Sequence, residues 1–184
     1  MRLSDIAKRL EENGVCGYDE FMEAVKTEVF EYEFENMMGT SEYIYYKWEG
    51  YLFPDTYQFY KNSTPREALE KMLDNFGNRF TEEMRGQLDV LNANVTGGSF
   101  DVNDVVIVAS LIEKESAAPA ESAKIAGVIY NRLFNWGSNP PYLNIDASIV
   151  YAQEGNNSRI DTKLDSPYNT YLYEGLTPGP IANP

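Results

Sequence analysis

The stretch DVNDVVIVASLIEKES, residues 101–116, decides how this chain is interpreted. Asp101 can cap a helix. After it, apolar residues recur at helical spacing and form one stripe: Val105, Val108, Leu111 and Ile112. On a wheel turning 100° per residue, Glu115 lies about 20° from Val108, whereas Glu113 lies about 140° away. The pattern therefore predicts a helix that buries Glu115 within its apolar face and exposes Glu113.

A carboxyl group at position 115 would suit acid–base chemistry if it is buried as the wheel predicts. Burial disfavours the ionised form and raises the pKa of a carboxyl, which a general acid working near neutral pH requires. The alternative is that the helix frays by Ser116 and Pro119 and leaves Glu115 in solvent. The spacing alone leaves both interpretations open.

The composition of the 184 residues excludes several kinds of chemistry. The chain has no histidine, so Ser-His-Asp triads, Cys-His pairs and HExxH zinc sites are impossible. Its single cysteine, Cys16, allows no intrachain disulfide, and a small buried side chain is its expected role. Acid–base chemistry must come from Asp, Glu, Lys or Tyr. We expect no metal and no cofactor.

Charge and hydropathy limit the partners. The net charge is −14, and so acidic a surface would repel a phosphate backbone, which argues against nucleic acid as a partner. No apolar run approaches the roughly 18–20 residues that span a bilayer. The length suits one domain, or one domain with a small appendage.

The rest of the chain mixes helical patterns with one aromatic segment. Helices are expected over 4–13 and 19–26, from Thr64 onward with a Thr/Glu capping box, and again from Pro119. Between residues 42 and 60, tyrosines and other aromatics crowd together among turn residues, which is typical of strands. We therefore expect an α+β fold, with a helical catalytic core and a strand-rich aromatic segment.

Five blocks of sequence resemble, in order, the MltG/YceG-like endolytic murein transglycosylases. The blocks are EGYLFPDTY (49–57), ASLIEKES (109–116), IAGVIYNRL (125–133), DSPYNTY (165–171) and GLTPGPIANP (175–184). The opening helices resemble the later part of the family's LysM-like subdomain. The resemblance implies a partial LysM-like subdomain over 1–40 and a catalytic domain over 41–184 that is truncated at its C-terminus.

The resemblance also implies an activity and a location. Members of the family are lytic transglycosylases that cut peptidoglycan between N-acetylmuramic acid and N-acetylglucosamine and leave 1,6-anhydro ends. They carry a membrane anchor, act outside the cytoplasm, and are thought to work beside wall-synthesis proteins. This chain is accordingly expected to be a soluble fragment that lacks the anchor.

The resemblance places the family's catalytic glutamate in the Glu-Lys-Glu block, and the wheel selects Glu115. The expected substrate-binding residues are Glu49, Asn131, Asp146, Tyr168, Asn169 and Tyr171. The three residues of the 165–171 block could instead pin their loop to the core, and Asn131 could cap its helix.

Three other functions compete with this one. A hydrolase would need a second carboxylate, for which Asp146 or Glu49 is the candidate. A non-catalytic scaffold that binds the wall is another possibility, although an unpaired carboxylate in a core would then be costly without a use. An older family label, aminodeoxychorismate lyase, requires pyridoxal phosphate, and no lysine here has a recognisable setting for it.

Overall fold

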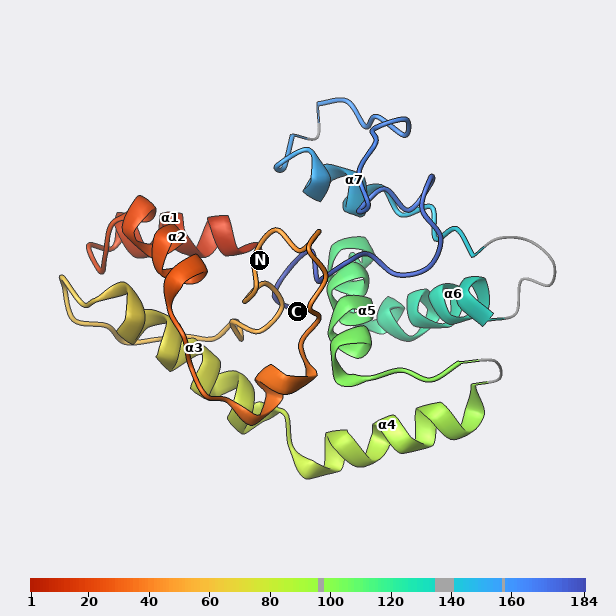
Figure 1. The fold of residues 1–184 in the computed structure, drawn as a ribbon, viewed down its shortest axis with the longest axis horizontal. Coiled ribbons are helices and arrows are strands. Elements are labelled where there is room, and N and C mark those ends of the chain that lie inside the picture. The colour runs from red at the N-terminus through yellow and green to blue at the C-terminus, as the bar shows by residue number, and fades with distance from the viewer. Residues whose placement is uncertain (96–97, 135–140, 157) are drawn as a thin grey trace.

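Helices are the only regular elements in the parts that the computed structural model describes, which are residues 1–95, 98–134, 141–156 and 158–184. Helix accounts for 51% of the structure, and these ranges contain no strand. In chain order the elements are α1 (Leu3–Glu12), α2 (Tyr18–Thr27), η1 (Glu33–Met37), α3 (Pro65–Arg79), α4 (Glu82–Asn94), α5 (Val102–Glu115), η2 (Pro119–Glu121), α6 (Ser122–Phe134) and α7 (Asp146–Ala152). Figure 1 shows α5 in the middle of this arrangement.

The expected α+β fold is wrong, because the aromatic segment forms no sheet. Residues 53–60 are extended, and their side chains partly alternate between half-buried and exposed, as in a strand. Within the described ranges, however, no second strand lies beside them, and a lone strand has no ladder to stabilise it. The preceding residues form turns whose aromatic side chains fill a helical core, so high β-propensity here reflects burial rather than pairing.

The capping signals and helical spacing in the sequence correctly predict α1, α2, α3 and α5. The clearest case is α3, where Thr64 Oγ1 accepts from the Glu67 N–H at 3.2 Å and Glu67 Oε2 accepts from the Thr64 N–H at 2.7 Å. Pro119 starts a short 3₁₀ turn, after which α6 begins at Ser122. Helices α4 and α7 were not predicted from the sequence.

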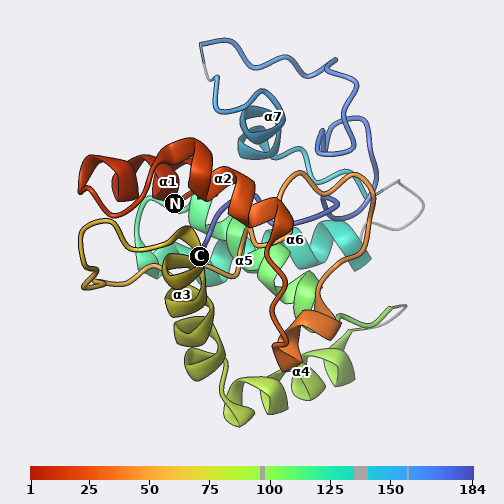
Figure 2. The same ribbon diagram turned by 60° about the vertical axis from the view of Figure 1, so that its left-hand side comes forward.

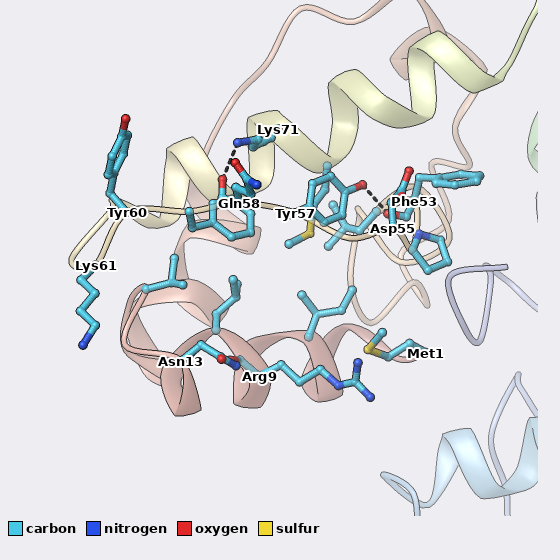
Figure 3. Close-up of a pocket in the computed structure, with 17 residues that line it drawn as sticks. Met1, Arg9, Asn13, Phe53, Asp55, Tyr57, Gln58, Tyr60, Lys61 and Lys71 are labelled. Atoms are coloured by element: carbon cyan, nitrogen blue, oxygen red, sulfur yellow. Dashed lines mark hydrogen bonds between the residues drawn. The ribbon is translucent and has the colours of Figure 1, made fainter.

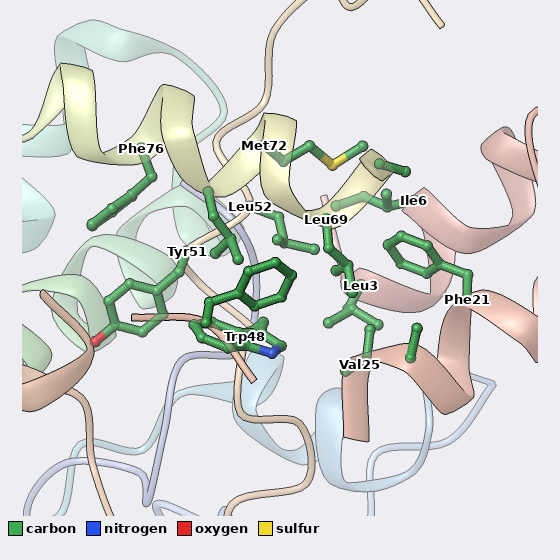
Figure 4. Close-up of a cluster of buried hydrophobic side chains, with 14 of the residues drawn as sticks. Leu3, Ile6, Phe21, Val25, Trp48, Tyr51, Leu52, Leu69, Met72 and Phe76 are labelled. Atoms are coloured by element: carbon green, nitrogen blue, oxygen red, sulfur yellow. The ribbon is translucent and has the colours of Figure 1, made fainter. Parts of the chain in front are cut away.

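Two hydrophobic cores meet at α5. The first is built from α1, α2, α3 and the aromatic turns, with Trp48, Tyr51 and Leu52 near its centre (Figure 4). The second joins α5 to α6, α7 and the C-terminal segment. Because α5 contributes Val106 to the first core and Leu111 to the second, it is buried on more than one side. The first core includes residues on both sides of position 40, and the domain boundary there stays a prediction.

The two ends of the chain lie together beside α5 (Figure 1). The Asn183 N–H donates to the Met1 carbonyl at 2.8 Å, and the Met1 ammonium donates to the Asn183 carbonyl at 3.2 Å. Within the described residues, none of the helices combines the length and the apolar character needed to cross a membrane.

Candidate active site

Glu115 is the last residue of α5, and its side chain is exposed. The expectation that it would be buried is therefore wrong. Helix α5 runs past the end of the core in its last turn, where Ser116 becomes the C-cap. The alternative expectation, that Glu115 lies in solvent, is the one that this structure matches.

Glu113 and Glu115 face different neighbours, as the wheel predicts. Burial lowers the pKa of the Met1 ammonium, and the nearby Lys114 lowers it further, while the charge of Glu113 partly offsets both. Glu113 thus lies toward the amino terminus. The charge of Glu115 instead acts on Tyr171, which belongs to the C-terminal loop.

Asp146 and Tyr171 form a pair beside Glu115. Asp146 is the first residue of α7 and is exposed, and its Oδ1 accepts from the Tyr171 hydroxyl at 2.7 Å. The pKa of Tyr171 is raised, chiefly because its hydroxyl donates to the Asp146 carboxylate and then because of partial burial. The charges of Asp146 and Glu115 raise it further, and the guanidinium of Arg132 opposes them. The hydrogen-bonded Asp146–Tyr171 pair therefore joins α7 to the C-terminal loop, within the electrostatic reach of Glu115 on α5 and Arg132 on α6.

Buried polar contacts hold the Tyr171 loop against the start of α7. The hydroxyl of Thr170 accepts from the Ile145 N–H at 2.9 Å and lies 3.0 Å from the Ser148 hydroxyl. The Thr170 carbonyl accepts from the Asn144 N–H at 3.0 Å. Thr170 and Ser148 were missed from the sequence, although short hydroxyl side chains suit buried links of this kind. Figure 2 shows α7 and this loop together above α5.

Tyr168 and Asn169 lie inside the protein, with neither side chain exposed. Asn169 donates to the carbonyls of Thr162 and Leu164 and accepts from the Tyr171 N–H at 3.1 Å. The Tyr168 ring packs against Tyr45 and Tyr151, with centroids 4.7 and 5.0 Å apart. In this structure both residues therefore fix their loop to the core, which is the alternative role expected for them. Direct contact with a substrate would need this loop to open.

On α6, Asn131 is exposed and lies next to Arg132 in the last turn. Arg132 donates through Nη1 to the Leu143 carbonyl, which links α6 to the segment that leads into α7. Sequence reasoning did not select Arg132 for the site. A cation at the end of a helix, in a chain with 29 acidic residues and 15 basic ones, was the signal that could have found it.

Glu49 lies apart from this cluster, inside the first core, and is 1% exposed. Burial raises the pKa of its carboxyl to about 7, against the opposing effect of the hydrogen bond from the Leu3 N–H. So small an exposed fraction leaves no surface for a ligand, so the expectation that Glu49 contacts a substrate directly does not fit the structure.

A large cavity of about 800 Å³ lies elsewhere, between α1, α3 and the extended residues 53–60 (Figure 3). Its walls carry Arg9 from α1 and Tyr57 and Tyr60 from the extended segment. None of the site residues expected from the sequence lines this cavity. This cavity and the candidate site at Glu115 are therefore different places.

The whole chain, residues 1–184, matches the sequence profile of the YceG-like family. This chain belongs to that family. Two relatives carry the name endolytic murein transglycosylase: the Bacillus subtilis protein is 38% identical over 138 residues, and the Streptococcus pneumoniae protein is 36% identical over 147 residues. These matches cover 73% and 76% of this chain but only 35% and 24% of the relatives.

A solved structure supports the same assignment. The crystal structure of a yceG-like protein from Listeria monocytogenes superposes with a TM-score of 0.81 at 26% identity. The match covers all of this chain and 60% of the other. The YceG-like chain described here thus spans well under two thirds of the length of the two named relatives and somewhat less than two thirds of the Listeria chain.

Proposed function

We propose that this YceG-like chain is the catalytic part of a lytic transglycosylase that cleaves peptidoglycan strands internally, between N-acetylmuramic acid and N-acetylglucosamine. The observation that carries the proposal is the exposed Glu115 beside the Asp146–Tyr171 pair and Arg132. Family membership and the names of two relatives support the choice of substrate.

In the proposed reaction one carboxyl group does both proton transfers. Protonated Glu115 donates its proton to the glycosidic oxygen as the bond from that oxygen to C1 of the muramyl sugar breaks. The Glu115 carboxylate then takes the proton of the muramyl C6 hydroxyl, whose oxygen bonds to C1 and closes the 1,6-anhydro ring. The substrate supplies its own nucleophile, so no water is consumed and Glu115 ends protonated again.

The glycan itself would provide the dry environment that the free protein lacks at Glu115. A sugar lying over the end of α5 would exclude water from the carboxyl and favour its protonated form. The hydroxyl of Tyr171 and the carboxylate of Asp146 stand beside it, where they can hydrogen-bond sugar hydroxyls and acetamides. The Tyr171 ring also offers a face on which a sugar can stack.

Hydrolysis is the second candidate, and Asp146 is the observation that favours it. This carboxylate is exposed and shares the neighbourhood of Tyr171 with Glu115, so it could serve as the second group that a hydrolase needs. Glu49 is too deeply buried for that role. Lytic cleavage is preferred because of the family assignment.

The substitution Glu115→Gln tests the proposal. Glutamine keeps the shape of the side chain but can neither give nor take the proton, and each such step contributes about 10²–10⁴-fold to a rate. We expect cleavage of purified peptidoglycan to fall to background, with the melting temperature unchanged because the side chain is exposed.

The control is Glu113→Gln, which alters the neighbouring exposed glutamate and should keep most of the activity. Loss of activity in Glu113→Gln alone would contradict the assignment of Glu115. A wild-type protein that binds glycan without cutting it would show the wall-binding scaffold instead.

We further propose, from family membership, that the protein works outside the cytoplasm on a membrane anchor beside wall-synthesis proteins. The division into a LysM-like part over 1–40 and a catalytic part over 41–184 belongs to the same proposal. Fractionation of cells that produce the whole protein, followed by protease access from outside, checks its location.

A further inference from the structure

Glu49 is a buried carboxylate that the proposed reaction does not use. It follows Trp48 in a turn of the first core, and its Oε1 accepts from the Leu3 N–H at 2.9 Å and from Asn183 Nδ2 at 2.8 Å. Its Oε2 lies 3.2 Å from the Leu3 nitrogen and 3.4 Å from the Tyr151 hydroxyl. One side chain thus connects the start of α1, the C-terminal segment and α7.

Asn183, which is fully buried, uses all the hydrogen-bonding capacity of its side chain at this junction. Its Oδ1 accepts from the N–H groups of Gly50 and Leu52, at 2.9 and 2.8 Å. Its Nδ2 donates to Glu49 and to the Met1 carbonyl, the latter at 3.1 Å. The Glu49–Asn183 pair therefore locks the end of the chain onto the turn that carries Glu49.

From this pair one connection runs to each helix that supplies a carboxylate to the candidate site. Tyr151, which reaches Glu49, lies on α7, whose first residue is Asp146. Two residues before Asn183, the Ile181 N–H donates to the Ser110 hydroxyl at 3.0 Å, and Ser110 lies on α5, which ends at Glu115. The same junction thus holds both α5 and α7.

We propose that Glu49 and Asn183 are positioning residues that fix α7 relative to α5 and thereby hold the Asp146–Tyr171 pair at Glu115. This inference rests on the proposed function for its effect on catalysis, but its structural part can be measured separately. Hydrogen bonds are directional and apolar packing is not, so a polar junction suits the task of setting the spacing of two side chains.

The cost of the arrangement also argues for a use. A buried carboxylate is expensive, and a well-packed apolar residue of similar volume is often as stable or more so. Position 49 nevertheless carries one, surrounded by large apolar side chains of the first core. The contacts survive in either protonation state, because the Tyr151 hydroxyl can donate to a carboxylate or accept from a carboxylic acid.

The test compares Glu49→Gln with Glu49→Ala in the whole chain. Glutamine can still accept from Leu3 and Asn183 through its oxygen and donate to Tyr151 through its nitrogen, so it should keep the site intact. Alanine removes all three contacts. Misplacement of catalytic groups by about 1 Å can cost on the order of 100-fold, so Glu49→Ala should lower kcat by about 10- to 100-fold and leave KM nearly unchanged.

A second readout follows the site without any reaction. The ¹³Cζ NMR signal of Tyr171, assigned with Tyr171→Phe, reports the hydrogen bond to Asp146. In Glu49→Ala it should move toward the value of a solvent-exposed tyrosine, and in Glu49→Gln it should stay. If folded Glu49→Ala keeps both kcat and the Tyr171 signal, the positioning role is overturned. If wild-type protein cuts no glycan, the proposed function fails, and the Tyr171 signal alone decides the positioning role.

Tyr151→Phe keeps the test decisive if Glu49→Ala does not fold. It deletes only the hydroxyl that reaches Glu49 and keeps the ring that packs on Tyr45 and Tyr168. Loss of one hydrogen bond should lower kcat about fivefold and shift the Tyr171 signal. The matched control is Tyr45→Phe, whose hydroxyl lies 3.3 Å from Ser166 and has no contact with Glu49, and it should change neither. Equal behaviour of the two variants would contradict the proposal.

Discussion

The two glutamates that matter most in this protein have opposite environments. Glu115 is exposed at the end of α5, next to a tyrosine–aspartate pair and an arginine. Glu49 is buried in the first core, where the Leu3 N–H, Asn183 and Tyr151 approach its two oxygens. Sequence reasoning assigned them the reverse way, with Glu115 buried and Glu49 in contact with the substrate.

The different exposure of the two carboxyl groups suits them to different tasks. A proton donor must reach the glycosidic oxygen, so an exposed carboxyl at the edge of two cores can act once the substrate covers it. A buried carboxylate cannot reach a substrate, but it can organise the backbone N–H groups and side chains around it. The raised pKa of Glu49 therefore does not mark it as a catalytic residue.

The largest effect on stability is expected from Asn183→Ala. The change leaves the N–H groups of Gly50 and Leu52 buried without their acceptor, and each such loss costs about 1–3 kcal/mol. Urea denaturation should therefore show a loss of about 2–5 kcal/mol in the free energy of unfolding. Asn94→Ala, at an exposed asparagine of α4, should change it by less than about 0.5 kcal/mol. Similar losses in both variants would mean that the junction is unimportant.

The next effect concerns Glu49 and pH. Because burial raises the pKa of Glu49 from 4.5 to about 7, the folded protein keeps a proton that the unfolded chain releases between these values. Stability from this group is present below pH 4.5 and lost as the pH rises through 7. The loss should be on the order of 3 kcal/mol, and Glu49→Gln should lack it.

The measurement is the free energy of unfolding of both proteins from pH 4 to pH 8. As the pH rises, the free energy of unfolding of wild type should fall relative to that of Glu49→Gln. The exposed Glu42→Gln serves as the control and should run parallel to wild type. If the difference in free energy of unfolding between wild type and Glu49→Gln stays constant from pH 4 to pH 8, this carboxyl does not titrate in that range.

A smaller effect is expected from Tyr171→Phe. The variant loses the hydrogen bond to Asp146 but keeps the ring, so cleavage should fall about fivefold, which corresponds to one hydrogen bond. Stability should change by less than about 0.5 kcal/mol, since Asp146 is exposed and water can replace the hydroxyl. Tyr173→Phe, which removes a comparable bond to Asp165, is the matched control and should cleave at the wild-type rate. If the two tyrosines are equally dispensable, Tyr171 does not contribute to the site.

Local signals predicted much of the helical framework. Helix α3 has its Thr64–Glu67 capping box and α5 its Asp101 cap, and both have apolar residues at helical spacing. Helix α4 escaped prediction because it contributes no fully buried residue, which leaves its periodicity weak. Helix α7 has only seven residues, too few to produce a periodic pattern.

The candidate site could not be predicted from any short stretch of sequence, because its contacts join residues that are far apart in the chain. The wheel could not show where the core stops along α5, which depends on the neighbours of that helix. The pairing of Tyr171 with Asp146 joins residues 25 positions apart, and the burial of Glu49 depends on a residue 134 positions away. The strand prediction failed for the same reason, because a strand needs a partner that its own sequence cannot supply.

If Glu115 alone carries a lytic reaction, the ends of the products will show it. Wild-type protein should digest purified peptidoglycan in ¹⁸O-labelled water, and mass spectrometry should identify the new muramyl ends. Lytic cleavage should leave 1,6-anhydro ends without ¹⁸O, because the substrate's own C6 hydroxyl attacks C1. Reducing muramyl ends that carry ¹⁸O would contradict it and would make Asp146 the second carboxylate of a hydrolase.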